Sequence, residues 1–339
     1  MLFLLYTGCS VRIRINWGIY LKFELLIGGI IMLHKSVLLT ESIENLNIKD
    51  GGIYVDATMG YGGHSKEILK KNKTGFLYGF DQDEYAVDYS NKFLKEFGTN
   101  FHIIKSNFAN LKSELAKYGV EKIDGILFDL GVSSVQLDQD ERGFSFHKDA
   151  RLDMRMDRDN PVSAYEVVNT YSLNDLIRIL RDYGEEKYAV SIAKNIAKYR
   201  ENKNIETTFE LVDIIKKSMP MKAMRDGHPA RKTFQAIRIE VNHELDVISV
   251  ALKDAIDMLN VGGRICVITF QSLEDRIVKN IFREYSEVDS KIKNLPFIPL
   301  QYMPKLKIVS KGIVASKEEL NENYRAHSAR LRVAEKIKD

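Results

Sequence analysis

The sequence has little of what several protein classes require. It contains two cysteines, Cys9 and Cys266, among 339 residues. Two cysteines provide neither a disulfide framework nor the spacing of a metal site, and they fit a reducing cytosol. No apolar run is long enough to span a membrane, and the apolar N-terminal stretch lacks the basic start of a signal peptide. We therefore expect a cytoplasmic protein without a metal centre, a membrane partner or internal repeats.

An excess of charge of one sign is also missing. Lysine and arginine total 50 and aspartate and glutamate total 47, which gives a formal net charge of +3. Such a balance does not demonstrate nucleic-acid binding, so only local basic clusters can indicate it. Hydrophobic residues make up 45% of the chain, enough for a sizeable core in one large or two modest domains.

The most informative stretch, residues 51–71, predicts a strand that ends in an acid, then a glycine turn and a helix. The apolar run 51–55 ends at Asp56, the turn covers residues 60–63, and from His64 the hydrophobic period becomes helical. Glycines allow positive φ and let the backbone approach a ligand closely. Open α/β sheets bind nucleotide-like cofactors at such turns, which follow the carboxyl ends of parallel strands.

The spacing of this turn argues against a dinucleotide. A Gly-x-Gly-x-x-Gly fingerprint that starts at Gly60 requires glycine where the chain has Ser65. Asp56 would repel a pyrophosphate, whereas it can accept hydrogen bonds near the ammonium group of S-adenosylmethionine. A second strand over residues 75–81 ends at Asp81, whose carboxylate can accept both ribose hydroxyls of either NAD or S-adenosylmethionine. An ordinary exposed turn with a capping aspartate is the alternative interpretation.

Two further strands extend this predicted sheet. Residues 101–104 form the third strand, and Phe108 follows it, where the ring can pack against adenine or simply anchor the next helix. Residues 123–129 form the fourth strand, which runs into a loop that contains glycine. In a methyltransferase-like sheet, the substrate atom meets the methyl donor at this edge. Asp129 is therefore the best candidate for handling a reacting group.

The strand pattern stops between residues 138 and 230, where apolar residues recur with helical spacing and indicate an inserted helical domain. One long helix is predicted from Phe234 to Leu259, followed by a turn at Gly262 and Gly263, a buried strand over residues 264–270 and a last strand near residues 307–309. The expected divisions are an N-terminal extension, 1–31, that either precedes the true start at Met32 or is disordered; two parts of the sheet domain, 32–137 and 231–339; and the insertion, 138–230.

Three clusters of basic residues lie next to loops at the carboxyl edge of this predicted sheet. Together they can form a surface that follows phosphates around one pocket. Acids are interleaved with the first cluster, so surface ion pairs that neutralise each other are an equal alternative there. The clusters are Arg142, Lys148, Arg151, Arg155 and Arg158; Lys216, Lys217, Lys222, Arg225, Arg231 and Lys232; and Arg325, His327, Arg330 and Arg332.

These segments together resemble the ribosomal RNA small subunit methyltransferase H family, also called MraW, from about His34 to Glu335. The resemblance implies a class I S-adenosylmethionine-dependent methyltransferase, an α/β protein with a Rossmann-like, mostly parallel seven-stranded sheet and an inserted all-α domain. It implies methylation of N4 of cytidine 1402 in 16S ribosomal RNA, at the decoding centre of the small subunit. The motifs that carry it are residues 60–65, 124–136, 141–146, 152–157, 228–231, 233–236 and 272–276.

The same resemblance implies site residues by motif position. The implied contacts with S-adenosylmethionine are Gly62, Gly63, His64, Asp81, Phe108, Asp129 and Gln136. The candidate contacts with the RNA, from the basic clusters and the motif at residues 228–231, are Arg142, Arg155, His228, Arg231, Arg325 and Arg330. Gln271 replaces a histidine that is usual in the family, which puts an acid–base role there in doubt. Tyr324 and His327 also depart from the family pattern and can weaken one RNA contact, and a homodimer stays an open question.

The available side chains favour methylation of an amine. Methylation of cytosine at carbon 5 requires a covalent adduct, normally through a cysteine thiolate, but Cys266 lies in an apolar run and Cys9 lies outside the domain. An exocyclic amine needs orientation and a hydrogen-bond acceptor, and Asp129 can be that acceptor. A cytidine buried in the ribosome must also be extracted to reach the site.

Two alternatives to methylation of ribosomal RNA stay open. A DNA amino-methyltransferase is one, although residues 129–132 read Asp-Leu-Gly-Val and not an Asn/Asp-Pro-Pro-Tyr-type loop. The other is a non-catalytic ribosome assembly factor that binds S-adenosylmethionine.

Overall fold

The computed structural model describes residues 4–7, 10–14, 20–24, 36–132, 140–288, 292 and 296–339. The chain divides into two compact units, Met1–Ser36 and Val37–Asp339. In the first unit, three short strands form an antiparallel sheet in the order β1-β2-β3. They are β1 (Leu4–Thr7), β2 (Ser10–Arg14) and β3 (Tyr20–Glu24). The prediction that residues 1–31 are untranslated or disordered stays a prediction.

The second unit combines a seven-stranded sheet with two groups of helices. Its strands are β4 (Ile53–Asp56), β5 (Phe76–Asp81), β6 (Phe101–Lys105), β7 (Ile123–Asp129), β8 (Leu259–Thr269), β9 (Leu306–Ile313) and β10 (Arg330–Lys336). Its α-helices are α1 (Leu39–Asn45), α2 (Gly63–Lys71), α3 (Glu84–Leu94), α4 (Leu111–Ala116), α6 (Ala164–Thr170), α7 (Leu173–Asp182), α8 (Ala189–Arg200), α9 (Thr208–Lys217), α10 (Arg231–Asn242), α11 (Glu244–Met258), α12 (Ser272–Ser286) and α13 (Lys317–Glu322). Short 3-10 turns are η1 (Phe108–Asn110), η2 (Asp140–Arg142), η3 (Met221–Asp226), η4 (Leu300–Tyr302) and η5 (Tyr324–Ser328).

The sheet has the strand order β6-β5-β4-β7-β8-β10-β9. The pairs β4–β5, β5–β6, β4–β7 and β7–β8 are parallel, whereas β10 runs antiparallel to β8 and β9. The predicted mostly parallel seven-stranded sheet is therefore confirmed. Because β4, β5, β6 and β7 are parallel, their carboxyl ends meet at one edge of the sheet, and the strand order switches sides between β4 and β7.

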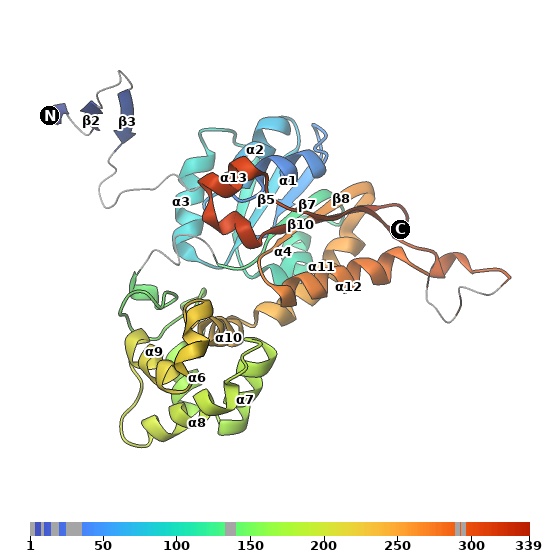
Figure 1. Ribbon diagram of the computed structural model, residues 1–339. Helices are drawn as coiled ribbons and strands as arrows, with labels where there is room; N and C mark the ends of the chain where they lie inside the picture. Colours follow the sequence, from blue (N-terminus) through green and yellow to red (C-terminus); the bar gives the residue numbers. More distant parts are fainter. Residues whose placement is uncertain are drawn as a thin grey trace. The chain divides into compact units, whose positions relative to one another are not determined.

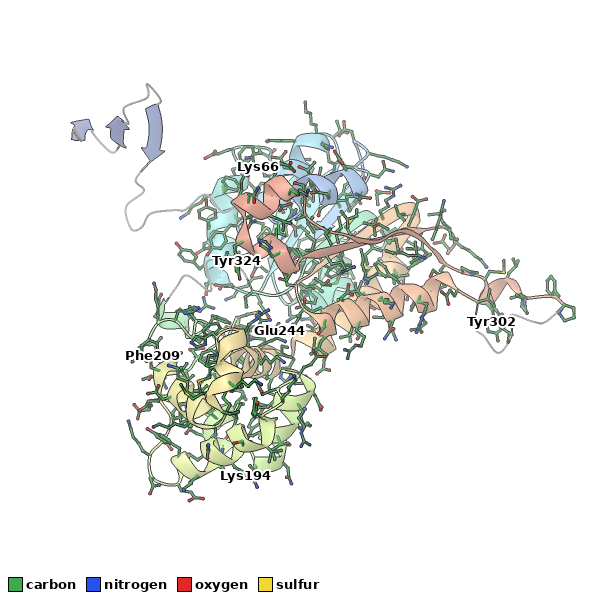
Figure 2. All side chains as sticks on the ribbon, viewed as in Figure 1. Lys66, Lys194, Phe209, Glu244, Tyr302 and Tyr324 are labelled. Atoms are coloured by element: carbon green, nitrogen blue, oxygen red, sulfur yellow. The ribbon has the colours of Figure 1, made fainter. Side chains whose placement is uncertain are left out.

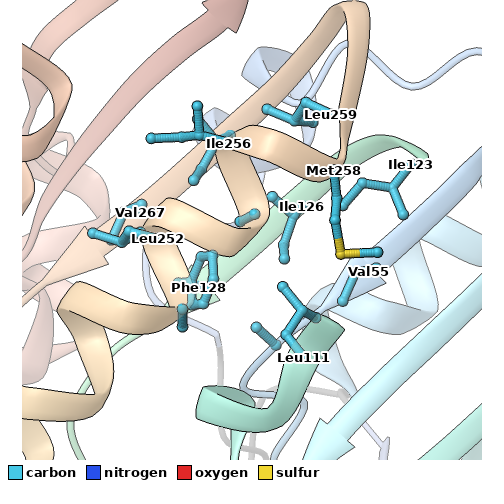
Figure 3. Packing of buried hydrophobic residues seen from close by; sticks show 14 of the residues in the cluster. Val55, Leu111, Ile123, Ile126, Phe128, Leu252, Ile256, Met258, Leu259 and Val267 are labelled. Atoms are coloured by element: carbon cyan, nitrogen blue, oxygen red, sulfur yellow. The ribbon is translucent and has the colours of Figure 1, made fainter. Parts of the chain in front are cut away.

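Helices cover both faces of this sheet (Figure 1). On one face, Ile126 and Phe128 of β7 pack with Leu252 and Ile256 of α11, and residues of α4 and α12 complete the cluster (Figure 3). On the other face, Leu127 packs with residues of α1, α2 and α3. Successive residues of β7 therefore alternate between two apolar layers, which explains why this strand is hydrophobic throughout.

The helices α6 to α9 form a separate core within the second unit, as predicted for the insertion (Figure 1). Several of these helices begin at capping residues, and Ser163 and Thr207 each form a reciprocal cap with a glutamate three residues later. The helical core also includes Phe234 and Ile237 of α10, beyond the expected end of the insertion at residue 230. The division into domains stays a prediction, but α10 packs with the helical group.

The single long helix predicted from Phe234 to Leu259 is wrong. The chain forms α10 and α11, and His243 separates them with a φ of 51°, in the left-handed region. Apolar residues recur across this break without interruption, so the sequence pattern gives no sign of it. The reason is that Ile237 packs in the helical core whereas Leu252 packs against the sheet. The chain must change direction between them so that each residue reaches its own core.

The C-terminal strands also differ from the prediction. Gly262 and Gly263 lie inside β8 and form no turn ahead of it, and the pairing register of β7 and β8 shifts beside them. The strand predicted at residues 307–309 lies within β9, but the sequence analysis missed β10 altogether. Charged side chains alternate with buried ones along β10, so the sequence pattern there suggests a basic cluster and not a strand. Among the described residues, no helix is long and apolar enough to cross a membrane.

Ile126 provides a test of the core. It is fully buried on the central strand β7. Ile126→Ala should lower the free energy of unfolding by roughly 2–5 kcal/mol, because it removes buried methyl groups and leaves a cavity. Urea denaturation followed by circular dichroism measures this loss. The matched control, Val309→Ala on β9, where the side chain is 38% exposed, should change stability by less than about 0.5 kcal/mol. Equal losses in the two variants would contradict this placement of the core.

Candidate active site

The glycine turn after β4 is organised by a buried carboxylate. Asp56 is 1% exposed, and its Oδ2 accepts a hydrogen bond of 2.7 Å from Ser65 Oγ while its Oδ1 accepts one of 3.3 Å from the Thr58 amide. Burial raises the pKa of Asp56 to about 6. The expected role of this carboxylate near the ammonium group of a cofactor is therefore not supported, since Asp56 is enclosed by its own loop.

Glycine is needed at the turn for conformational reasons. Gly62 precedes α2 with a φ of 78°, and a Cβ atom there would lie 3.1 Å from the side chain of Leu94. Gly63 is the first residue of the helix, whose N-terminal amides face the loop. Glycine at position 62 therefore serves the left-handed turn and the packing against Leu94, and the cofactor contacts predicted for Gly62 and Gly63 stay predictions.

Asp81 ends the neighbouring strand and holds the turn from the other side. Its Oδ2 accepts a hydrogen bond of 2.9 Å from the Gly60 amide, and its Oδ1 accepts one of 2.8 Å from the Asp83 amide. Burial raises the pKa of Asp81 to about 6, and these backbone donors oppose that rise. Each oxygen keeps a second lone pair, so Asp81 can still accept hydroxyl groups of a ribose.

Asp129 ends β7. Of the carboxylates that end β4, β5 and β7, it has the fewest hydrogen bonds. Its backbone amide donates to Thr58 Oγ1 at 2.6 Å, which ties it to the glycine turn. The side chain keeps 25% of its surface exposed, but Oδ1 is buried and has no hydrogen-bond partner. Burial, together with the negative charges of Asp56 and Glu274, raises the pKa of Asp129 to about 8. A carboxylate in this state can take up a proton or a hydrogen bond from a ligand.

His64 lies beside Asp129 and is also buried. The distance from His64 Nδ1 to Asp129 Oδ2 is 3.8 Å, and His64 Nε2 has no hydrogen-bond partner. Burial lowers the pKa of His64 to about 4, so the imidazole is neutral near pH 7. Each of these two neighbouring side chains, at the end of β7 and the start of α2, therefore has one buried polar atom without a partner.

Phe108 lines a small cavity next to this edge. Its ring packs edge-on against Phe128, with the centroids 5.7 Å apart, and the ring also faces the cavity. The sheet domain contributes Gln82, Asn107, Leu130, Gly131, Glu244, Val247, Ile248 and Glu274 to the lining, and Met156 and Asn242 complete it. Phe108 thus both anchors the core and borders a cavity, so both interpretations of this residue fit the structure.

Two of the residues predicted to bind RNA point elsewhere. Arg142 is 3% exposed and its guanidinium pairs with Asp83 at 2.9 Å. Arg155 binds both carboxylate oxygens of Asp153 at 2.9 Å and donates to two backbone carbonyls. Because each guanidinium is engaged within the protein, the structure gives no support for a phosphate contact at either residue, and both RNA contacts stay predictions.

The remaining RNA candidates are more accessible. His228 is half-buried and stacks on Phe146, with the ring centroids 4.4 Å apart. Arg231 begins α10 and is exposed, as is Arg330 at the start of β10, whereas Arg325 is half-buried in η5. The predicted cofactor residue Gln136 lies outside the described residues.

The two departures from the family pattern occupy different surroundings. Gln271 precedes α12, where the Glu274 carboxylate accepts hydrogen bonds from the Gln271 amide and from its side-chain nitrogen. This places Gln271 in a helix cap. Tyr324 is 86% exposed, with its ring 5.4 Å from that of His327.

The sequence analysis missed the polar residues that join the insertion to the sheet. Gln82 and Asp83 follow Asp81 and contact Met156 and Arg142, respectively. Arg238 binds Glu244 through two hydrogen bonds of 2.7 and 2.8 Å, across the break between α10 and α11. The only signal in the sequence is that Asp83 precedes a helix, which suggests a cap and not a partner for a distant arginine. Among the described residues, no cluster of histidine, cysteine, aspartate or glutamate side chains is arranged to hold a metal ion.

The strand order, the antiparallel strand β10, the glycine turn and the acids that end β4, β5 and β7 define a class I methyltransferase fold. The sequence profile of the MraW methylase family matches residues 31–337. The chain therefore belongs to the MraW methylase family.

Two relatives with high sequence identity agree with this assignment. The chain is 56% identical over 308 residues to the ribosomal RNA small subunit methyltransferase H of Exiguobacterium sibiricum, which covers 90% of this chain and 99% of that protein. It is 55% identical over 307 residues to the protein of the same name from Clostridioides difficile, with the same coverage. A solved structure of an rRNA methylase from Streptococcus thermophilus matches 88% of this chain and 94% of that chain, with 14% identity and a TM-score of 0.41.

The raised pKa of Asp129 predicts how stability depends on pH. Its pKa is about 8 in the folded protein and about 3.9 when the chain is unfolded. Between these values the folded state keeps a proton that the unfolded state has lost, so this residue makes stability fall as pH rises, by at most about 1.4 kcal/mol per pH unit. Asp129→Asn should remove this fall and be more stable than the wild type at pH 8.

Urea denaturation at pH 5 and pH 8 measures the effect. The control Asp213→Asn, where the side chain is 66% exposed on α9, should stay within about 0.5 kcal/mol of the wild type at both pH values. If Asp129→Asn destabilised the protein more at pH 8 than at pH 5, the burial of this carboxylate would be assigned wrongly.

Proposed function

We propose that the protein transfers a methyl group from S-adenosylmethionine to the exocyclic N4 of cytidine 1402 in 16S ribosomal RNA of the small subunit. The observation that carries this proposal is the Asp129 carboxylate, which has a buried oxygen without a partner next to a glycine turn. Membership in the MraW methylase family and the names of the related proteins support the same substrate class.

The residues present fit S-adenosylmethionine. Gly63 begins α2, whose N-terminal amides are donors for a ligand at the turn, and Asp81 keeps lone pairs for ribose hydroxyls. His64 Nε2 and Asp129 Oδ1 are buried polar atoms that lack partners, as expected where a polar ligand completes the site. Phe108 borders the small cavity beside this edge, and its ring is the aromatic surface there that an adenine would contact. When bound, this cofactor supplies the electrophilic methyl group.

Asp129 provides what an exocyclic amine requires. The lone pair of the cytosine amino group is delocalised into the ring, so the enzyme must orient the group and accept its hydrogen bonds as it becomes pyramidal. Asp129 Oδ1 is a suitable acceptor because no described residue donates a hydrogen bond to it. Its raised pKa also makes the ionised carboxylate a stronger base, which can take the proton that the amine loses.

Cysteine chemistry at carbon 5 of cytosine finds no support. Cys266 is fully buried in β8, with its Sγ 3.9 Å from the Ser42 carbonyl, and burial raises the pKa of its thiol to about 12. A thiol in this environment is not a nucleophile at neutral pH. Direct transfer to an amine is therefore the chemistry that these side chains favour.

A methyl-transfer assay tests the proposal. Labelled S-adenosylmethionine is incubated with unmodified small ribosomal subunits, free 16S RNA and duplex DNA, and the products are digested to nucleosides and identified by mass spectrometry. We expect label in N4-methylcytidine from the ribosomal substrate. Label in DNA or at carbon 5 would contradict the proposal, and tight subunit binding without any label would favour a non-catalytic assembly role.

Asp129→Ala should lower the rate of methyl transfer by roughly 10²- to 10⁴-fold, the usual loss when a positioned acid–base group is removed. Single-turnover kinetics with saturating cofactor measure this rate, and calorimetry shows whether the variant still binds the cofactor. The control Asp213→Ala changes an exposed carboxylate on α9 and should keep the wild-type rate. Near-full turnover by Asp129→Ala would remove Asp129 from the reaction.

Arg231→Ala should weaken RNA binding and leave cofactor binding unchanged, because this exposed arginine begins α10 in the helical group. Loss of one phosphate contact reduces the salt dependence of RNA affinity by about one unit of slope. Filter binding across a salt series measures this slope. The control Lys253→Ala removes an exposed charge from α11 and should keep the wild-type slope. An unchanged slope for Arg231→Ala would show that this residue contacts no phosphate.

A further inference from the structure

Arg142 connects the start of the insertion to the loop that follows β5. Its Nη1 donates to Asp83 Oδ2 at 2.9 Å, and its Nη2 donates to the carbonyls of Arg155 and Met156 at 2.9 and 3.3 Å. The side chain of Arg142 is 4% exposed and that of Asp83 is 12% exposed. A buried guanidinium is stable only while its partners surround it, so these contacts fix the segment around Met156 against the loop.

Asp83 carries this contact to the proposed ribose site. Its backbone amide donates to Asp81 Oδ1 at 2.8 Å, and its Oδ1 accepts a hydrogen bond of 3.1 Å from the Tyr85 amide at the start of α3. The same short loop therefore positions the carboxylate of Asp81 and receives the charge of Arg142. A shift of Asp83 would move both groups together.

Met156 carries the contact to the proposed adenine site. Its Sδ accepts a hydrogen bond of 3.2 Å from Gln82 Nε2, and its amide donates to Asn242 Oδ1 at 2.8 Å. Met156, Asn242 and Gln82 line one cavity together with Phe108. Glu244, which also lines this cavity, begins α11 where the helical group meets the sheet domain (Figure 2). The segment that Arg142 holds is thus one wall of the cavity.

We propose that Arg142 is a positioning residue that couples cofactor binding to docking of the helical insertion. Through Asp83 and Met156 it holds the insertion against the loop that supplies the ribose carboxylate and against the adenine cavity. Coupling of this kind is reciprocal, so bound cofactor also holds residues 152–157 in place. This inference rests on the proposed function, because it takes the cavity as the site of the adenine.

Calorimetry with S-adenosylmethionine tests the coupling in the full chain without RNA. Arg142→Met should weaken cofactor binding by about tenfold, within the range usual for two coupled sites. Asp83→Asn keeps the size of the side chain and its cap on α3 but removes the charge, and it should weaken binding in the same direction. In the double variant the losses should not add, because both substitutions break one contact.

A matched control removes a similar ion pair elsewhere. Arg264 on β8 binds Glu335 of β10 at 2.9 Å, away from the cavity lining. Arg264→Met should lower the melting temperature and leave cofactor affinity unchanged. Hydrogen exchange adds a readout that lost stability does not imitate: bound cofactor should slow exchange at residues 152–157 in the wild type but not in Asp83→Asn.

The outcomes separate the two proposals. If the wild type bound no S-adenosylmethionine, the proposed function would fail and this inference would fail with it. If the wild type bound the cofactor and both Arg142→Met and Asp83→Asn bound it equally well, only the coupling would be overturned. Circular dichroism confirms that each variant is folded, and Asp83→Asn decides the question if Arg142→Met is not.

Discussion

Three carboxylates at the ends of adjacent parallel strands are the constraint on which the site depends. Asp56, Asp81 and Asp129 end β4, β5 and β7, so the topology gathers three carboxyl groups at one edge. A carboxylate that leaves water is costly unless donors replace its hydration. The glycine turn and the residues beside it provide donors to the first two, through Ser65, Thr58 and the amides of Gly60 and Asp83, and these contacts fix the turn.

Asp129 is the exception, and the exception is informative. Its buried oxygen has no partner, and the nearby charges of Asp56 and Glu274 raise its pKa further above that of an ordinary carboxylate. A fold selected for stability alone would replace or pair such a group, since an amide or an apolar residue avoids the cost of burial. Unfavourable burial that the rest of the site tolerates is expected where a ligand completes the interactions. The local instability thus agrees with a role for Asp129 in the reaction.

Much of the sheet domain could be predicted because its signals are local. The runs that end at Asp56, Asp81 and Asp129 show their apolar character and their acid within a few residues. Contacts over long separations left no such signal. Arg142 pairs with Asp83, 59 residues earlier, and in a sequence it cannot be distinguished from an arginine that binds phosphate. The break at His243 also leaves no signal in the sequence. The apolar residues before it pack in the helical core and those after it pack against the sheet, so the apolar pattern continues across the break.

Polar contacts help to fix the position of the insertion on the sheet domain. Its helices bury their apolar residues in a core of their own, so that core does not fix its relation to the sheet. The pair of Arg142 with Asp83 holds the beginning of the insertion, and the pair of Arg238 with Glu244 holds its end at the break after α10. Both pairs are largely buried, and ionic contacts of this kind are directional in a way that apolar surfaces are not. A domain that must present its surface to one edge of a sheet needs that directionality, and these two ion pairs supply part of it where the chain enters and leaves the insertion.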